Sequence, residues 1–367
     1  MAKKAVKRAF KYRFYPTPEQ AAELNRTFGC VRLVWNKALD ERQRRYTTEQ
    51  KSTTYVQASA ALTQWKKTDD LAFLREVSSV PLQQALRHQQ TAFSNFFAKR
   101  AKYPRFKSRK KSRASAEYTR SGFSWRDGQL TLAKMSKPLD VHWSRGLPGE
   151  PSMVTVSRDS ADRWFVSILT EDTITTLPQV AATVGIDVGL TTLATLSTGE
   201  KITNPRHERR DRLKLAKAQR ELSRKEKGSN NREKARRKVA RVYARIADRR
   251  TDHLHKLSTR LIRENQAIAI EDLSVRNMVA NHSLARAISD ASWRQLRTML
   301  EYKADWYGRD LLVVDRWYPS TRVCSECGAL HDRLPLNIRE WTCRCGTVHD
   351  RDANAARNIL AAGLAER

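Results

Sequence analysis

Val184 to Gly199 reads V-G-I-D-V-G-L-T-T-L-A-T-L-S-T-G, and this stretch decides the fold. It begins as an apolar, β-branched run, turns at Gly189, and continues as Thr alternating with Leu or Ala up to Thr198 and Gly199. Two such runs around a short turn predict a β-hairpin. Asp187 would then lie at the rim of a sheet, and Gly189, which has no Cβ, would let a phosphate or a metal ion approach the backbone.

Two further acids occur in matching positions later in the chain. The apolar run 266–270 ends at Glu271, and Asp350 opens the sequence D-R-D-A-N-A-A, an expected helix whose first turn carries Asp352. A single Asp at a strand end usually does no more than end the strand and begin a turn. Three carboxylates from two strand ends and one helix start can instead converge on divalent metal ions, which prefer oxygen ligands. Asp352 is the preferred third ligand, and Asp350 competes with it.

Four of the five cysteines cluster near the C-terminal end of the sequence: Cys324, Cys327, Cys343 and Cys345. Each pair is followed by Gly, and the spacing is close to that of the two knuckles of a zinc ribbon. Four thiolates would hold one structural Zn²⁺ in a closed tetrahedral site. The second pair has one intervening residue where two are usual, so His349 or His331 could replace Cys345.

The net charge indicates a polyanionic partner. The 367 residues include 70 Lys or Arg against 39 Asp or Glu, a net charge of +31, and nucleic acid is the simplest partner for such an excess. No apolar run approaches the roughly 20 residues that a bilayer span needs, and no signal-peptide core follows the N-terminal basic residues. We therefore expect no membrane association, and a location in the cytoplasm or at the nucleoid.

The first half of the chain predicts one strand, three helices and then several short strands. Residues 7–15 alternate basic and apolar side chains, and Thr17 is a good capping residue for a helix that follows. Two more helices are expected over 56–66 and 81–99, the latter with Phe93, Phe96 and Phe97 on its buried face. Turn residues separate expected strands near 117–125, 128–133, 151–157 and 162–170, a pattern typical of a small antiparallel barrel.

Two basic segments predict contacts with nucleic acid. Residues 103–113, Y-P-R-F-K-S-R-K-K-S-R, mix cations with aromatic rings and read as a contact loop, with a solvated linker as the alternative. Residues 205–264 predict a helical hairpin, broken at 228–231, and residues 206–263 hold 22 Lys or Arg against seven Asp or Glu, a net charge of +15. His253-Leu254-His255 superficially matches a transposase signature, but residues two apart on a helix point about 200° apart and cannot share one metal ion.

The region after Glu271 continues as alternating helix and strand. An amphipathic helix is expected over 288–307, followed by a buried strand over 311–314. Alternation of this kind favours an α/β layer in which helices cover a sheet.

Several motifs together resemble the TnpB (OrfB) proteins of bacterial insertion sequences, relatives of the type V CRISPR effectors. They are G-I-D-V-G, I-E-D-L-S-V-R-N-M, P-S-T-R-V-C-S-E-C-G and H-D-R-D-A-N-A-A-R-N-I, with Y-R-F-Y-P-T-P-E-Q near the N-terminus. The resemblance implies an α/β, RNase H-like RuvC nuclease domain with an inserted zinc ribbon, and an N-terminal β-barrel wedge domain that carries a helical recognition insertion. We expect the wedge at 1–15 plus 103–180, the helical domain at 16–102, the nuclease domain at 181–317 plus 351–367, and the ribbon at 318–350.

The resemblance implies an RNA-guided DNA endonuclease of a transposable element. One protein copy would bind a guide RNA made from the element's end and cut the double-stranded target DNA that the guide pairs with. Asp187, Glu271 and Asp352 would hold two catalytic Mg²⁺ ions for phosphodiester hydrolysis. Two alternatives stay open: a guide-independent transposase or recombinase accessory protein that binds element DNA, and a nuclease-silent RNA-guided regulator.

Overall fold

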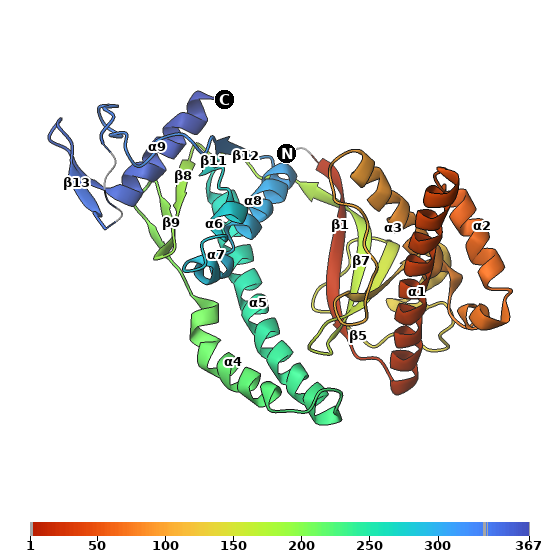
Figure 1. Cartoon of the computed structure of the whole chain (residues 1–367). Coiled ribbons are helices and arrows are strands. Elements are labelled where there is room, and N and C mark those ends of the chain that lie inside the picture. The colour runs from red at the N-terminus through yellow and green to blue at the C-terminus, as the bar shows by residue number, and fades with distance from the viewer. Residues whose placement is uncertain (1–2, 333–334, 336, 367) are drawn as a thin grey trace. The chain divides into compact units, whose positions relative to one another are not determined.

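The computed structural model describes residues 3–332, 335 and 337–366 of the chain (Figure 1). The chain forms two compact units, one made of residues 5–172 and the other of residues 173–367 together with residues 1–4. Each unit has its own sheet and its own hydrophobic core.

The first unit is built around a five-stranded sheet in the order β2-β6-β7-β1-β5. Its strands are β1 (Lys3–Phe14), β2 (Ala114–Thr119), β5 (Val141–His142), β6 (Pro151–Arg158) and β7 (Trp164–Thr175). Burial alternates along β1, which confirms the expected strand with one charged face. β1 lies between β7 and β5, so the strand that precedes the helices joins the strands that follow them.

The strands of this unit do not close into the barrel expected from the sequence. β2 and β5 are the edges of the sheet, and β3 (Phe123–Arg126) and β4 (Gln129–Leu132) form a separate antiparallel ribbon in the part of the unit that the structure describes. Leu130 and Leu132 of the ribbon are buried in the same core as the sheet. The turn pattern located the strands, but it did not determine which edges pair, because pairing depends on contacts between distant residues.

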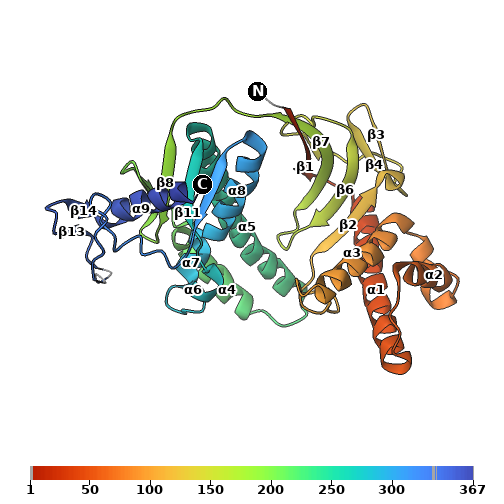
Figure 2. The same cartoon turned by 90° about the horizontal axis from the view of Figure 1, so that it is seen from above.

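All three expected helices of the first unit are present, and α1 and α3 pack on each other (Figure 2). They are α1 (Pro18–Glu49), α2 (Tyr55–Trp65) and α3 (Ser79–Phe97), with the short 3₁₀ helices η1 (Asp69–Arg75) and η2 (Arg120–Gly122). α1 begins with a capping box: the Thr17 hydroxyl accepts from the Gln20 N–H at 3.3 Å, and the Gln20 side chain accepts from the Thr17 N–H at 3.1 Å.

The end of α3 differs from the expectation. Phe93 is buried, but Phe97 is 72% exposed and packs only against neighbouring rings of Phe93 and Phe96 among the aromatic contacts of the described residues. Helical spacing placed all three rings on one face. The core covers this face only as far as Phe93, because α3 ends at residue 97.

The second unit has a mixed five-stranded sheet in the order β10-β9-β8-β11-β12. Its strands are β8 (Thr183–Val188), β9 (Thr192–Leu196), β10 (Lys201–Thr203), β11 (Ala267–Glu271) and β12 (Asp310–Val314). β8 and β9 are antiparallel neighbours, which confirms the hairpin expected at 184–199, and β11 runs parallel to both β8 and β12.

Helices cover both faces of this sheet, as the alternating pattern predicted (Figure 2). α5 (Asn230–Glu264) and α8 (Trp293–Tyr307) share a core with one face, and α9 (Arg351–Ala365) packs on the other. The remaining elements are α4 (His207–Ser223), α6 (Val275–Met278), α7 (Ala285–Ala291), β13 (Glu340–Thr342) and β14 (Val348–Asp350). The single helix expected over 288–307 is divided into α7 and α8 at Ser292, whose φ is 55°.

At Gly185, α9 packs directly against the sheet. A Cβ at this position would lie 2.0 Å from the Ala356 carbonyl oxygen and 2.8 Å from the Leu360 Cβ. No side chain fits at such distances, so a glycine is required here for α9 to lie directly on β8.

We expect Gly185→Ala to destabilise the protein by about 3 kcal/mol, because α9 must move off the sheet. Urea unfolding followed by circular dichroism measures the change. Gly29→Ala is a suitable control, since nothing lies within 4 Å of a Cβ built at this position inside α1, and it should leave stability equal or slightly higher. Equal unfolding midpoints for Gly185→Ala and wild type would contradict the proposed close packing.

Candidate active site and metal centre

Asp187 and Glu271 lie at the carboxyl ends of neighbouring parallel strands. The register pairs Ile270 of β11 with Ile186 of β8, so Glu271 and Asp187 are the next residues on the two strands. Strands in a sheet are about 4.8 Å apart, which makes these two acids side-by-side neighbours. The sequence predicted both strand ends, and the structure brings them together.

Alternation along the two strands determines which face the acids share. Ile186 and Ile270 are buried in the core formed with α5 and α8. Successive side chains of a strand point to opposite faces, so Asp187 and Glu271 point to the face that α9 covers.

Asp352 reaches this face from the first turn of α9. It precedes Ala356 by four residues, about one helical turn, and the Ala356 carbonyl is the group that lies against Gly185 of β8. Asp352 thus lies one helical turn before the residue that contacts Gly185. Asp187 lies two residues after Gly185 on β8. The charges of Asp352 and Glu271 both act on Asp187, so the three acids lie near one another at the carboxyl end of these strands.

The charges of these acids influence one another. Burial raises the pKa of Asp187 to about 8, and the charges of Asp352 and Glu271 contribute in the same direction. Burial, followed by the charge of Asp272, also raises the pKa of Glu271. The carboxylate oxygens of Asp187, Glu271 and Asp352 do not all lie within 4.8 Å of one another. Among the described residues, the four cysteines are the only group of potential metal ligands that meets this distance. A bound divalent cation would relieve the repulsion that raises these pKa values.

Asp350 is engaged elsewhere. One of its oxygens accepts a hydrogen bond from the Ala353 N–H at 2.9 Å and so caps α9, and the other lies 2.6 Å from the Lys201 Nζ. Burial raises its pKa, but the bonds to Lys201 and Ala353 outweigh burial and lower it overall. Asp352 also pairs with a cation, Arg339, at the longer distance of 3.4 Å, but it lies in the first turn of α9 and does not cap the helix. These contacts favour Asp352 as the third ligand.

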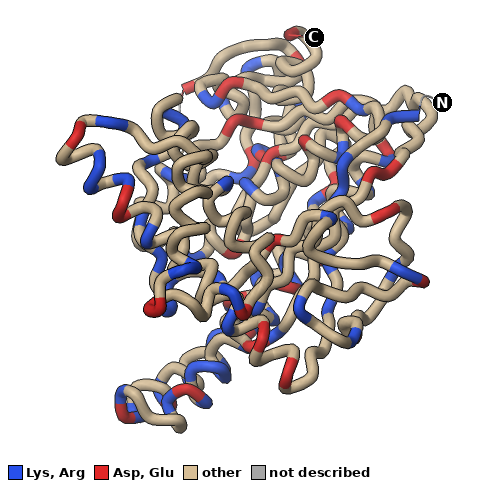
Figure 3. Tube along the Cα trace, turned by 90° about the vertical axis from the view of Figure 1, so that its right-hand side faces the viewer, with Lys and Arg blue, Asp and Glu red and all other residues tan. Residues whose placement is uncertain are grey.

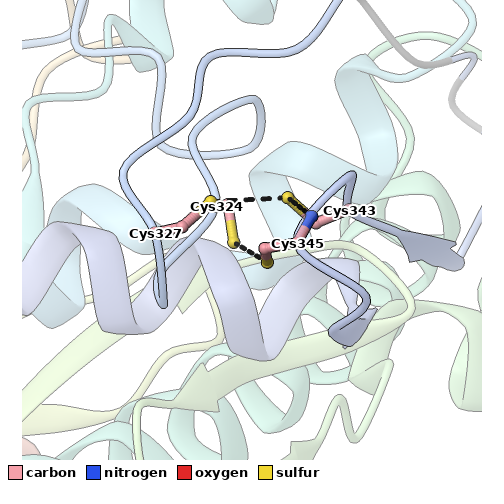
Figure 4. Close-up of side chains that lie close together, drawn as sticks. All are labelled: Cys324, Cys327, Cys343 and Cys345. Atoms are coloured by element: carbon pink, nitrogen blue, oxygen red, sulfur yellow. Dashed lines mark hydrogen bonds between the residues drawn. The ribbon is translucent and has the colours of Figure 1, made fainter.

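The four cysteines form a compact cluster (Figure 4). Their sulfur atoms all lie within 4.8 Å of one another, with 3.8 Å between Cys324 and Cys345 and 3.6 Å between Cys327 and Cys343. A tetrahedron with Zn–S bonds of about 2.3 Å has edges of about 3.8 Å, so the cluster fits Zn²⁺.

Cys345 belongs to the cluster despite the short second knuckle. Gly328 and Gly346 adopt positive φ values of 72° and 88°, and their N–H groups donate to the carbonyls of Cys324 and Cys343, both at 2.9 Å. The second turn is one residue tighter than the first, yet a glycine with positive φ closes each knuckle.

The two alternative ligands lie outside the sulfur cluster. The His349 Nε2 is 3.0 Å from the Cys324 sulfur, and the His331 Nε2 is 3.2 Å from the Cys343 sulfur. Each ring is thus in hydrogen-bonding contact with one sulfur, and neither joins the set of mutually close ligand atoms found among the described residues.

Asn354 and Asn358 connect the cysteine cluster to α9, a role that the sequence reasoning missed. Asn354 accepts from the Ser325 N–H at 2.9 Å and donates to the Val323 carbonyl at 2.8 Å. Asn358 donates to the same carbonyl at 2.6 Å and to the Ser320 carbonyl at 2.8 Å. Both side chains are buried, and their spacing of four on one helix was the available signal. The first knuckle is therefore fixed to the helix that carries Asp352.

The basic helical hairpin is formed by α4 and α5, and its Lys and Arg residues are spread along both helices at the bottom of Figure 3. The turn that joins the two helices contains Gly228, whose φ is 94°. His253 and His255 lie on α5, which confirms that they cannot share a metal ion in the manner of a strand motif. None of the described helices is both long enough and apolar enough to span a bilayer.

Three family models match successive parts of the chain. The OrfB model of IS605, described as "Probable transposase", matches residues 165–282. A model described as "Cas12f1-like, TNB domain" matches residues 293–359, and a helix-turn-helix domain model matches residues 1–51. The first match contains Asp187 and Glu271, and the second contains the cysteine cluster and Asp352.

Relatives match nearly the whole chain. A Streptomyces pristinaespiralis protein named "Putative RNA-guided DNA endonuclease" is 73% identical over 98% of this chain and 90% of its own. "Putative RNA-guided DNA endonuclease InsQ" of Escherichia coli K12 is 36% identical over 97% and 92%. The "Cryo-EM structure of the Cas12f1-sgRNA-target DNA complex" has the same fold, with a TM-score of 0.56 at 12% identity over 97% of this chain and 98% of that one.

The raised pKa of Asp187 predicts a pH-dependent stability in magnesium-free buffer. An unfolded Asp titrates near pH 3.9, and the folded value is about 8, so the folded protein holds the proton more tightly. This contribution is complete below pH 4 and is lost as the pH rises to 8. Asp187→Asn should therefore exceed wild type in stability at pH 8 by about 1–2 kcal/mol, measured by urea unfolding.

Asp252→Asn is the control for this measurement, because Asp252 is an exposed acid paired with Lys256 on α5. Its unfolding midpoint should follow that of wild type at every pH. Parallel curves for wild type and Asp187→Asn from pH 4 to 8 would contradict the raised pKa of this half-buried carboxyl.

The cysteine geometry predicts which side chains bind zinc. Cys345→Ser should lower zinc affinity at least about 100-fold, whereas His349→Ala should retain one zinc per chain, since His349 contacts a sulfur and is not part of the cluster. Competition with a colorimetric chelator measures both. Loss of zinc in His349→Ala with retention in Cys345→Ser would reverse the assignment.

Proposed function

The chain belongs to the IS605 OrfB (TnpB) family, and we propose that it is an RNA-guided DNA endonuclease of a transposable element. The observation that supports this proposal is the position of Asp187 and Glu271 on neighbouring strand ends, together with the effect of the Asp352 and Glu271 charges on Asp187. Two of these acids extend from rigid strands, and the third is held by a helix packed directly on β8.

The donor set suits Mg²⁺, because three carboxylates supply hard oxygen ligands on one side of an otherwise cationic protein. When bound, two Mg²⁺ ions would activate water and stabilise the leaving 3′ oxygen of the phosphodiester. Asp187 and Glu271 would orient their oxygens from neighbouring strands, and Asp352 would close the site from α9. The raised pKa values of Asp187 and Glu271 support this role, since a site that favours protonation also gains from a cation.

The rest of the chain would bind the nucleic acids. We assign residues 181–317 plus 351–367 to a RuvC-like nuclease domain, 318–350 to the zinc ribbon, 1–15 plus 103–180 to a wedge domain, and 16–102 to a recognition domain.

The α4–α5 hairpin, with its net charge of +15, would follow a phosphate backbone. Base pairing with a guide RNA would supply the sequence specificity for double-stranded DNA, and one protein copy would bind each guide.

Zinc would serve a structural role. Four thiolates leave no open coordination position for water, so the ribbon would not take part in hydrolysis. Through Asn354 and Asn358 it would instead hold the start of α9, and with it Asp352, in place.

A plasmid-cleavage assay tests the nuclease. We expect Asp187→Ala, loaded with the RNA that co-purifies with the protein, to lose at least about 100-fold in cleavage rate while it retains RNA and target binding. Asp252→Ala, the exposed acid of α5, should cut like wild type. A wild type that binds target but cuts no faster than Asp187→Ala would identify the nuclease-silent regulator.

RNA dependence separates the remaining alternative. Protein freed of RNA should not act on DNA, and sequencing of the co-purified RNA should give one discrete species. Strand joining at element ends by RNA-free protein would instead identify a guide-independent transposase.

A further inference from the structure

The first unit contains a cationic pocket of about 460 Å³, which we call the α1–β2 pocket. It lies among α1, the segment 107–115 and the end of β6. Six cations line it: Arg26, Arg32, Lys107, Arg109, Arg113 and Arg158. None of the described lining residues is acidic, and the volume is in the range of small-ligand sites.

The cations of this pocket are only partly neutralised by the protein. Arg26 pairs with Glu23 and Glu76, and Arg158 pairs with Asp162. Arg32 and Arg109 have no acidic partner in the described part of the chain. Two unpaired guanidinium groups at the wall of a concave site are the arrangement that binds phosphate.

Lys107, one of the lining residues, is held against α1 by several contacts. The Asn36 side chain donates to the Lys107 carbonyl at 2.9 Å and accepts from the Lys107 N–H at 2.7 Å. The Trp35 ring N–H donates to the Arg105 carbonyl at 3.0 Å, and the Lys107 Nζ lies 3.8 Å from the centre of the Trp35 ring. These contacts hold residues 105 and 107 of the expected contact loop against α1, which reduces the ordering that ligand binding would require there.

The ammonium group of Lys107 is partly buried and therefore poorly solvated. Burial lowers its pKa, and it has no acidic partner in the described residues. An anion in the pocket would supply the countercharge that the protein does not.

We propose that the α1–β2 pocket binds a phosphate group of a bound nucleic-acid strand, held by Arg32 and Arg109. The polar side chains of Asn25, Ser112 and Ser115 line the same pocket and would hydrogen-bond the sugar or the phosphate. The inference rests on the proposed function for the presence of a strand, and it concerns binding, not hydrolysis. It places a specific anchor on the unit that lacks the three acids.

Salt-dependent binding tests the pocket in the full-length protein. The probes are a fluorescent 20-nucleotide single-stranded RNA and its DNA counterpart, each with a 5′-phosphate or a 5′-hydroxyl, in magnesium-free buffer. The double variant Arg32→Ala and Arg109→Ala should weaken binding roughly 10- to 100-fold. It should also reduce the slope of log Kd against log salt by about 0.7, since both guanidinium groups hold one phosphate and one lost phosphate contact with a single strand contributes about 0.7.

The matched control removes two exposed cations outside the pocket, Arg100→Ala and Lys102→Ala. Thermal unfolding of both double variants confirms that they fold. A loss confined to 5′-phosphorylated probes identifies a terminal phosphate as the ligand, and an equal loss for both ends identifies a backbone phosphate. Equal weakening by the pocket and control variants overturns the proposal, and it does so whether or not the protein cleaves DNA.

Discussion

The absence of a side chain at Gly185 is the constraint on which the candidate site depends. Because the Ala356 carbonyl would meet a Cβ there at 2.0 Å, α9 can lie on β8 only over a glycine. That contact fixes the height of α9 above the sheet, and the helix then carries Asp352 to the strand end where Asp187 lies. Side chains alternate along β8, and Ile186 is buried in the core on the opposite face of the sheet. Asp187 therefore points to the face that α9 covers.

Two further sets of contacts hold the same helix. At its start, Asp350 caps the first turn, and buried Asn354 and Asn358 bind the backbone of the first cysteine knuckle. Zinc binding and the position of Asp352 are therefore linked through a few hydrogen bonds of 2.6–2.9 Å. Arg339 neutralises part of the negative charge that gathers there.

The sequence was most informative where local pattern determines structure. The hairpin around Asp187, the strand end at Glu271 and the cysteine spacing were all predictable, because each depends on neighbouring residues. The strand pairings of the described residues do not form the expected closed barrel, and the exposure of Phe97 was missed, since strand pairing and burial depend on partners far along the chain. The α1–β2 pocket could not be predicted for the same reason: α1 and the segment 107–115 meet only in the folded unit.

Because α9 lies near the C-terminal end of the sequence, it is synthesised after the two strands that carry Asp187 and Glu271. Asp187 and Glu271 leave the ribosome before the cysteines do, and Asp352 is added 81 residues after Glu271. At 5–20 residues per second, about 4–16 seconds separate those two events. During this interval a nascent chain has both strand acids, yet it lacks the last acid of the proposed site. Cutting would thus become possible only after the zinc knuckles have been made.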